Sequence, residues 1–171
     1  NLYPGRKKII KYKNTRSLIS IITTFYNSGN FIEQTAKSVL NQTFPDYEWI
    51  IVDDGSTDED SLTLLNKIKE LDSRIKVYHK SNGGLAETRD FGASKSSKES
   101  KYLVFLDDDD LINETFLECG FWTLETNNTA SWAYVDTVNF GQESYIWKKW
   151  FDTKREKKEN LLVAMAMIRK S

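Results

Sequence analysis

A chain of 171 residues is long enough for one domain with a sizeable core and too short for two comfortable ones. Its 39% hydrophobic and 29% charged residues, with only two prolines, exclude a fibrous or disordered protein. The net charge of −1 predicts no bulk attraction to nucleic acid. We therefore expect a single domain over residues 1–171.

Cysteine content and hydropathy bear on the compartment. Cys119 is the single cysteine, so the chain has no internal disulfide and no cysteine-based zinc site, and a reducing compartment is favoured. No apolar run approaches the roughly 18 residues that span a bilayer, and no signal-peptide pattern opens the chain. We expect a cytoplasmic protein. Basic residues cluster in residues 1–16 and at Lys148–Lys158, either as solvated faces or as a contact with an acidic partner or the inner face of the membrane.

The first two thirds of the chain alternate strand-like and helical patterns. Apolar runs predict strands at Leu18–Phe25, Trp49–Val52, Ile75–Tyr78 and Tyr102–Leu106, each followed by helical spacing. The predicted buried helix faces are Phe31, Thr35, Val39 and Leu40, then Leu62, Leu65, Ile68 and Leu71. Continuously apolar strands indicate a parallel sheet buried between helices. The predicted fold is a three-layer α/β/α sandwich.

After about Ala130 the pattern becomes mixed. We predict a strand at Trp132–Val138 and note an apolar run at Leu161–Ile168. Between them lie the aromatic residues Tyr145, Trp147, Trp150 and Phe151. These aromatics form either a core segment or an exposed surface for an acceptor or partner.

Ligands of open parallel sheets bind beyond the carboxyl ends of the strands, and every predicted strand here ends in polar residues. The fourth strand delivers Asp107–Asp110, whose like charges raise one another's pKa unless a cation or helix N-terminus compensates. Carboxylates of this kind suit Mg²⁺ or Mn²⁺. The alternative is a solvated acidic turn that caps a helix beginning near Asn113.

Two other strand ends carry polar motifs. Asp53 and Asp54 lead into a glycine turn, so a carboxylate there either accepts hydrogen bonds from a base or ribose or simply belongs to a strand-turn-helix connection. The next loop, Asn82–Gly84, precedes a helix whose Arg89 could approach a phosphate. His79, the only histidine, is assigned a structural or incidental role, and no G-x-S-x-G elbow supports a triad through it.

Taken in order, these motifs resemble those of family 2 inverting glycosyltransferases. The motifs are Ser20–Asn27, Ser38–Thr43, Val52–Asp58, Asn82–Gly84 with Arg89, and Phe105–Asp110. The resemblance implies the Rossmann-like GT-A fold of nucleotide-diphospho-sugar transferases, with a mostly parallel sheet. It also implies a donor-binding part at about residues 17–117, followed by an incomplete acceptor part.

The resemblance assigns roles on the nucleotide side. Thr24, Tyr26 and Asp54 fall where the family contacts the nucleobase, and Arg89 falls near the nucleotide. Many members carry proline at the position of Thr24, and the intact flanking pattern makes this a tolerated difference. The implied donor is a UDP-sugar, and the implied activity is hexosyl or N-acetylhexosaminyl transfer in polysaccharide biosynthesis.

The aspartate run corresponds to the family's D-x-D region. We expect Asp109 to be the ligand of Mg²⁺ or Mn²⁺, Asp108 to contact the ribose or sugar, and Asp107 to lie near the donor sugar or metal. The acceptor is a hydroxyl of a glycan, lipid or protein. An inverting transfer also needs a carboxylate base, which the resemblance puts beyond Ser171, so neither Asp136 nor Glu143 is assigned this role. We expect the chain to be part of a longer protein.

Other functions stay open from the sequence. A sugar-nucleotide pyrophosphorylase would carry a glycine-rich loop near its first strand, which Thr23–Gly29 lacks. A phosphoacceptor receiver domain shares the acidic strand ends but not the Asn82–Gly84 and Arg89 element. A non-catalytic nucleotide-sugar-binding module is the main alternative to an enzyme.

Overall fold

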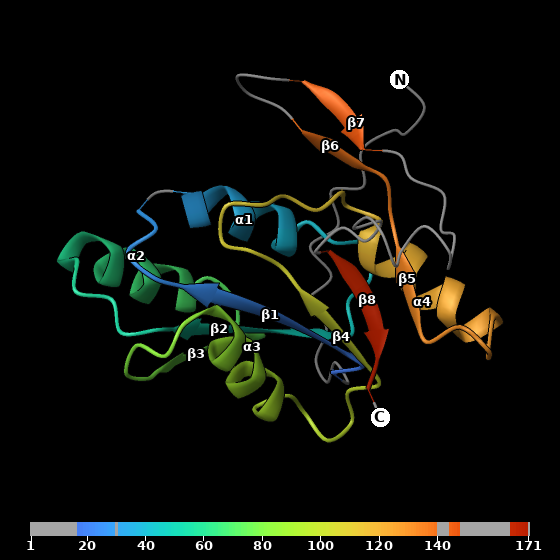
Figure 1. The fold of residues 1–171 in the computed structure, drawn as a ribbon, viewed down its shortest axis with the longest axis horizontal. Helices are drawn as coiled ribbons and strands as arrows, with labels where there is room; N and C mark the ends of the chain where they lie inside the picture. Colours follow the sequence, from blue (N-terminus) through green and yellow to red (C-terminus); the bar gives the residue numbers. More distant parts are fainter. Residues whose placement is uncertain (1–16, 30, 140–143, 148–164, 171) are drawn as a thin grey trace, which may run out of the picture.

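The computed structural model of the protein describes residues 17–29, 31–139, 144–147 and 165–170. Its strands are β1 (Ile19–Phe25), β2 (Tyr47–Asp53), β3 (Ile75–His79), β4 (Tyr102–Phe105), β5 (Trp132–Tyr134), β6 (Thr137–Asn139), β7 (Tyr145–Trp147) and β8 (Ala166–Arg169). Its helices are α1 (Phe31–Leu40), α2 (Glu59–Lys69), α3 (Leu85–Ser94) and α4 (Phe116–Thr126). Among the described residues, no helix combines the length and apolar character needed to cross a membrane. The predicted β/α alternation is confirmed (Figure 1).

A six-stranded sheet of order β3-β2-β1-β4-β8-β5 forms the centre of the fold (Figure 1). Strand β1 pairs in parallel with β2 and β4, and β2 pairs in parallel with β3. Strand β8 runs antiparallel to both of its neighbours, β4 and β5. The sheet is thus mostly parallel, as predicted.

Strands β1 and β2 are the most buried part of the sheet. All seven residues of β2 are buried, including Trp49, whose indole N–H donates to the Thr23 hydroxyl over 2.9 Å. One face of these strands packs into the core with α1, α2 and α4. The other face meets α3, where Gly92 lies against Ile22 and Val52. Burial on both faces explains the continuous apolar runs and confirms the three-layer sandwich.

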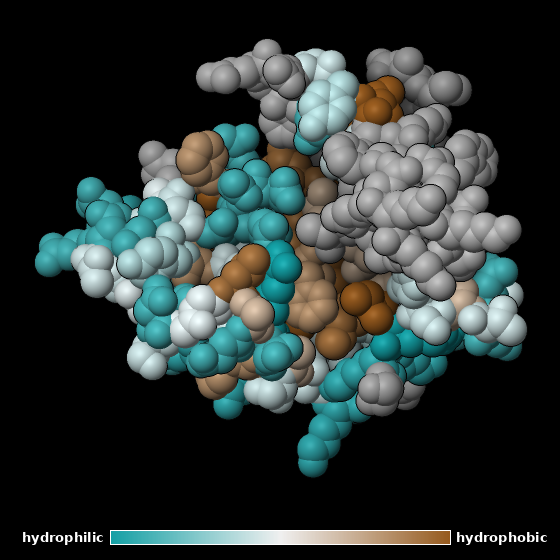
Figure 2. All heavy atoms as spheres, viewed as in Figure 1, coloured by the Kyte–Doolittle hydropathy of each residue, from teal (hydrophilic) through white to brown (hydrophobic). Residues whose placement is uncertain are grey.

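The predicted helix faces are only partly correct. Thr35 and Val39 are buried on the inner face of α1, and Leu65 is buried on the inner face of α2. Phe31 is 61% exposed because it opens α1 beside the strand-end loops, and Leu71 is 61% exposed because α2 has already ended at Lys69. On the face shown in Figure 2, α2 presents mainly polar atoms, as expected for the outer side of an amphipathic helix.

The segment after Ala130 differs from its prediction. The single strand expected at Trp132–Val138 is wrong: β5 joins the large sheet, whereas β6 pairs with β7 in a separate two-stranded sheet. Tyr145 is 46% exposed, so the core interpretation of the aromatic segment is wrong for this residue. Trp150 and Phe151 lie outside the described residues.

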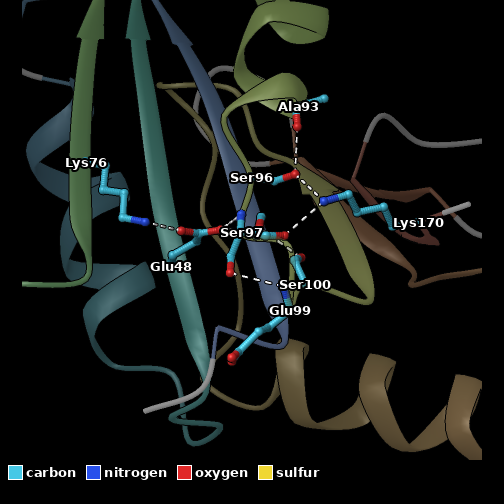
Figure 3. Close-up of polar contacts among 9 residues, drawn as sticks. Glu48, Lys76, Ala93, Ser96, Ser97, Glu99, Ser100 and Lys170 are labelled. Carbon is cyan, nitrogen blue, oxygen red and sulfur yellow. Dashed lines mark hydrogen bonds and ion pairs between the residues drawn. The ribbon is translucent and has the colours of Figure 1, made fainter. Parts of the chain in front are cut away.

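A buried carboxylate organises the amino-terminal edge of the sheet (Figure 3). Glu48, 2% exposed, accepts hydrogen bonds from the Ser20 hydroxyl, the Lys76 ammonium and the Ser97 backbone N–H, each at 2.6 Å. Burial alone would raise the pKa of Glu48, but these donors together lower it. Lys170, just after β8, donates to the Ser97 carbonyl over 2.9 Å. The network ties the strands together at the edge opposite the polar strand ends.

Candidate functional site

The four parallel strands deliver their polar ends to one edge of the sheet, as the sequence predicted. Residues 26–29 follow β1, residues 54–58 follow β2, residues 80–84 follow β3, and residues 106–110 follow β4. Hydrogen bonds between these loops show that they form a single constellation.

The first two loops are joined by Asn27. Its side-chain oxygen accepts hydrogen bonds from the backbone N–H groups of Thr57 and Asp58, at 2.9 and 3.0 Å. Asn27 adopts a positive φ of 49°, a conformation that asparagine tolerates better than most residues. Beside it, Thr24 is half-buried at the end of β1, and the Tyr26 ring is 51% exposed. The two predicted nucleobase contacts therefore lie at the open end of β1.

The Asp54 carboxylate is hydrogen-bonded to the loop after β3. Its Oδ1 accepts from the Lys80 ammonium at 2.8 Å and the Gly83 N–H at 2.9 Å, and its Oδ2 accepts from the Gly84 N–H at 2.9 Å. Burial alone would raise the pKa of Asp54, but these hydrogen bonds lower it to about 2. The buried Thr88 hydroxyl also lowers this pKa, although its oxygen has no partner within hydrogen-bond geometry among the described residues.

A nucleobase contact by Asp54 stays a prediction. The carboxylate can accept about four hydrogen bonds and already carries three from its own chain. The loop that Asp54 holds leads directly into α3, which carries Arg89. This supporting role was not evident from the sequence.

Acid should weaken the fold through Asp54. The folded pKa of about 2 lies below the ordinary 3.8, so this stabilisation is complete above pH 4 and is lost as the pH falls toward 2. Asp54→Asn should lower the free energy of unfolding at pH 7 by about 1–2 kcal/mol, because the charged acceptor is lost. Urea unfolding at pH 7 and pH 3 should show a smaller acid-induced loss for the variant. An equal loss in both proteins would contradict the assignment.

Arg89 and the aspartate run meet at this edge. The Arg89 guanidinium donates to the Asp107 carboxylate over 2.5 Å, and both side chains are about one third exposed or less, at 27% and 35%. The predicted nucleotide-side arginine thus lies beside the predicted metal region. An arginine paired with a carboxylate at the rim can also present its remaining N–H groups to a phosphate.

The remaining aspartates differ in environment. Asp108 accepts a hydrogen bond from the Ser28 hydroxyl, and burial, followed by the neighbouring charges of Asp109 and Asp107, raises its pKa despite that bond. Burial and the same two neighbours also raise the pKa of Asp110. Asp109 itself is exposed. The run therefore concentrates negative charge that a cation would stabilise.

The donor set fits a divalent cation shared with a substrate better than one enclosed by protein. Within the described residues, no group of three or more His, Cys, Asp or Glu side chains is placed to hold a metal ion. Mg²⁺ sites commonly use one or two carboxylates and complete their coordination with phosphate oxygens and water. The exposed carboxylate of Asp109 and the nearby Asp108 provide hard oxygen donors of this kind.

A cavity of about 520 Å³ adjoins the aspartate run. Asp109 and Asp110 line it together with Asn113, Cys119 and Val138. Sequence reasoning did not place Cys119 or Val138 near the site, since they come from α4 and β6 and carry no motif. Space for a further ligand therefore lies beside the predicted metal region.

A mostly parallel sheet between helices, with an aspartate run at its carboxyl edge, has the GT-A architecture of nucleotide-sugar glycosyltransferases. The model of the family "Glycosyl transferase family 2" matches residues 20–167, and the chain belongs to this family. The resemblance drawn from the motifs is confirmed, and it takes precedence over the receiver and pyrophosphorylase interpretations.

The chain is similar to several named proteins. It is 42% identical over 110 residues to an uncharacterized glycosyltransferase of Rickettsia bellii, covering 64% of this chain and 15% of that protein. It is 40% identical over 106 residues to the putative teichuronic acid biosynthesis glycosyltransferase TuaG of Bacillus subtilis, covering 61% of this chain and 41% of TuaG. Among solved structures, TarS 1–349 of S. aureus in complex with UDP-GlcNAc aligns with a TM-score of 0.58 and 28% identity, covering 64% of this chain and 32% of the TarS 1–349 chain. The chain thus spans less than half the length of these proteins.

Proposed function

We propose that this chain is the donor-binding part of an inverting glycosyltransferase that uses a UDP-sugar and a divalent metal. The observation that carries the proposal is that hydrogen bonds join the aspartate run both to Arg89 and to Ser28, in the loop after β1 that also holds Tyr26, at the carboxyl edge of the sheet. The likeness to TarS in complex with UDP-GlcNAc supports UDP as the nucleotide and a hexosyl or N-acetylhexosaminyl group as the sugar.

The proposed roles follow the positions of the side chains. Tyr26, exposed at the open end of β1, stacks on or borders the base, with Thr24 and Asp54 contacting its polar edge. Asp108, held by Ser28, contacts the ribose or sugar. Arg89 lies close enough to the aspartate run to approach the diphosphate.

Asp109 is the proposed ligand of Mg²⁺ or Mn²⁺, and Asp107 the carboxylate near the donor sugar or metal. A bound divalent cation would stabilise the negative charge that develops on the departing nucleoside diphosphate. The protein's part is to hold Asp109 exposed at the wall of the pocket, two residues after the Asp107 that pairs with Arg89, so that cation and donor can bind together.

The residues that bind the acceptor and activate its hydroxyl are not identified within this chain. Inversion requires a carboxylate to deprotonate the acceptor hydroxyl, and we place that base beyond Ser171. The name of TuaG supports a glycan or lipid-linked acceptor in polysaccharide biosynthesis. We propose action in the cytoplasm, with peripheral contact at the inner face of the membrane.

Calorimetric titration with UDP, GDP and ADP, with and without Mn²⁺, tests the donor site. We expect UDP to bind at least tenfold more tightly with Mn²⁺, because the cation bridges carboxylate and diphosphate charges, and to bind more tightly than GDP or ADP. Preference for GDP would leave the fold assignment unchanged and would indicate a GDP-sugar as the donor. Failure of a folded protein to bind any nucleotide would contradict the proposed donor site in this chain.

A turnover measurement on a longer form of the protein distinguishes an enzyme from a binding module. Incubated with a UDP-sugar that binds, an enzyme should release UDP faster when acceptor is added, whereas a module should bind donor without turnover. Donor binding without UDP release over a panel of glycan and lipid acceptors would favour the non-catalytic alternative.

A further inference from the structure

Helix α1 contacts the aspartate run through a threonine that the proposed roles do not use. The Thr35 hydroxyl lies 2.8 Å from the backbone carbonyl oxygen of Asp108 and 2.9 Å from that of Asp110. Both carbonyls are acceptors, so the hydroxyl donates its single proton to one or shares it between them. Thr35 is fully buried, at 0% exposure, so water does not compete for this proton.

The two carbonyls flank Asp109. Thr35 therefore fixes the backbone immediately before and after the exposed carboxylate, while leaving that carboxylate free. The run is also a turn, since the Asp110 N–H donates to the Asp107 carbonyl over 3.2 Å. A side chain of a separate element thus constrains the backbone from which the Asp109 side chain projects.

Ser38 of α1 and Gln42, two residues beyond its end, contact the residues that follow the aspartate run. The Ser38 hydroxyl accepts the Ile112 N–H at 3.3 Å. The Gln42 amide donates to the Asn113 carbonyl over 2.7 Å and accepts the Leu117 N–H at 3.0 Å. Thr35 and Ser38 of α1, together with Gln42 just after the helix, therefore bind successive parts of the segment from the aspartate run to the start of α4.

We propose that Thr35 is a positioning residue for the divalent cation and the nucleotide diphosphate, acting through the backbone on both sides of Asp109. The inference rests on the proposed function, in which Asp109 binds the cation. Of the three residues, Thr35 is the one that contacts the aspartate run itself, whereas Ser38 and Gln42 anchor the residues beyond it.

Thr35→Val keeps the shape of the side chain and removes the hydroxyl, whereas Thr35→Ser keeps the hydroxyl. Mn²⁺ affinity, followed by the electron paramagnetic resonance signal of free Mn²⁺ at saturating UDP, should fall about tenfold in the valine variant and stay within about threefold of wild type in the serine variant. Ser38→Ala is the matched control, because it removes a neighbouring hydroxyl that does not contact Asp108 or Asp110. Its Mn²⁺ affinity should equal that of the wild type.

Thermal unfolding without metal distinguishes a loss of positioning from a general loss of stability as the cause of weaker Mn²⁺ binding. Thr35→Val and Ser38→Ala should both lower the Tm, yet only the former should weaken Mn²⁺ binding. Wild-type Mn²⁺ affinity in folded Thr35→Val would overturn the positioning role, as would equal weakening in Ser38→Ala. If the valine variant does not fold, Thr35→Ala provides the same comparison. Absence of Mn²⁺-dependent UDP binding in the wild type would instead refute the proposed function.

Discussion

Replacing Asp109 by alanine is expected to abolish metal-dependent UDP binding while leaving the fold intact. Its side chain is exposed, so its removal creates no cavity and leaves no buried group without a partner. As the proposed metal ligand, however, Asp109 supplies charge that no alanine replaces. We expect UDP affinity in the presence of Mn²⁺ to fall at least tenfold, to the level measured without metal.

Calorimetry with and without Mn²⁺ measures this loss, and circular dichroism checks the fold. Glu99→Ala is the control, since it removes an exposed carboxylate at the opposite edge of the sheet (Figure 3) and should leave the Mn²⁺ effect unchanged. Persistence of metal-dependent binding in Asp109→Ala would move the metal role to another aspartate, and Asp108→Ala would be the next variant to measure.

Replacing Gly92 by alanine is expected to give the largest loss of stability. A Cβ at this position of α3 would lie 2.5 Å from Cγ2 of Ile22 and 3.2 Å from Cγ2 of Val52, both on buried strands. Overpacking of this kind typically costs about 1–3 kcal/mol and occasionally more. Alanine's better helix propensity offsets about 1 kcal/mol. Because the 2.5 Å approach to Ile22 puts the overpacking cost at the upper end of this range, about 3 kcal/mol, we expect a net loss of about 2 kcal/mol in urea unfolding.

Gly120→Ala is the matched control, because it makes the same change inside another helix. There the new Cβ would meet Cε of Met167 at 2.9 Å, the far end of a flexible side chain that can move aside. The variant should lose less than about 1 kcal/mol, or gain stability. Equal losses in the two variants would show that the approach of α3 to β1 and β2 is not the cause.

The sequence predicted the first four strands and the loops after them well for a physical reason. Strands buried on both faces are continuously apolar, which distinguishes them from the polar loops that follow. Parallel pairing then brings the loop ends to one edge, so Tyr26, Arg89 and the aspartate run could be grouped before their positions were known. The four parallel strands and the polar loops after them were predicted correctly for this reason.

Features that depend on distant partners were not predictable. Strand β8 has four residues, and nothing in Ala166–Arg169 specifies that it enters the sheet between β4 and β5 in the antiparallel direction. Thr35 was expected on a buried helix face, but its pattern gave no sign that its hydroxyl contacts the aspartate run. The internal partners of Asp54 are likewise set by the path of the loop after β3.

Strand β8 is the last strand of the sheet to be synthesised, and this order affects how the chain folds during translation. Strands β1 to β4 and their ligand-side loops are all translated before residues 166–169, which fill the gap between β4 and β5. Until then, one edge of β4 carries unpaired backbone groups beside apolar side chains, a template for intermolecular pairing. Nascent or truncated chains that end before Ala166 should therefore aggregate more readily than chains that include β8. Expression boundaries for this protein should be placed after β8, even when only the nucleotide side is of interest.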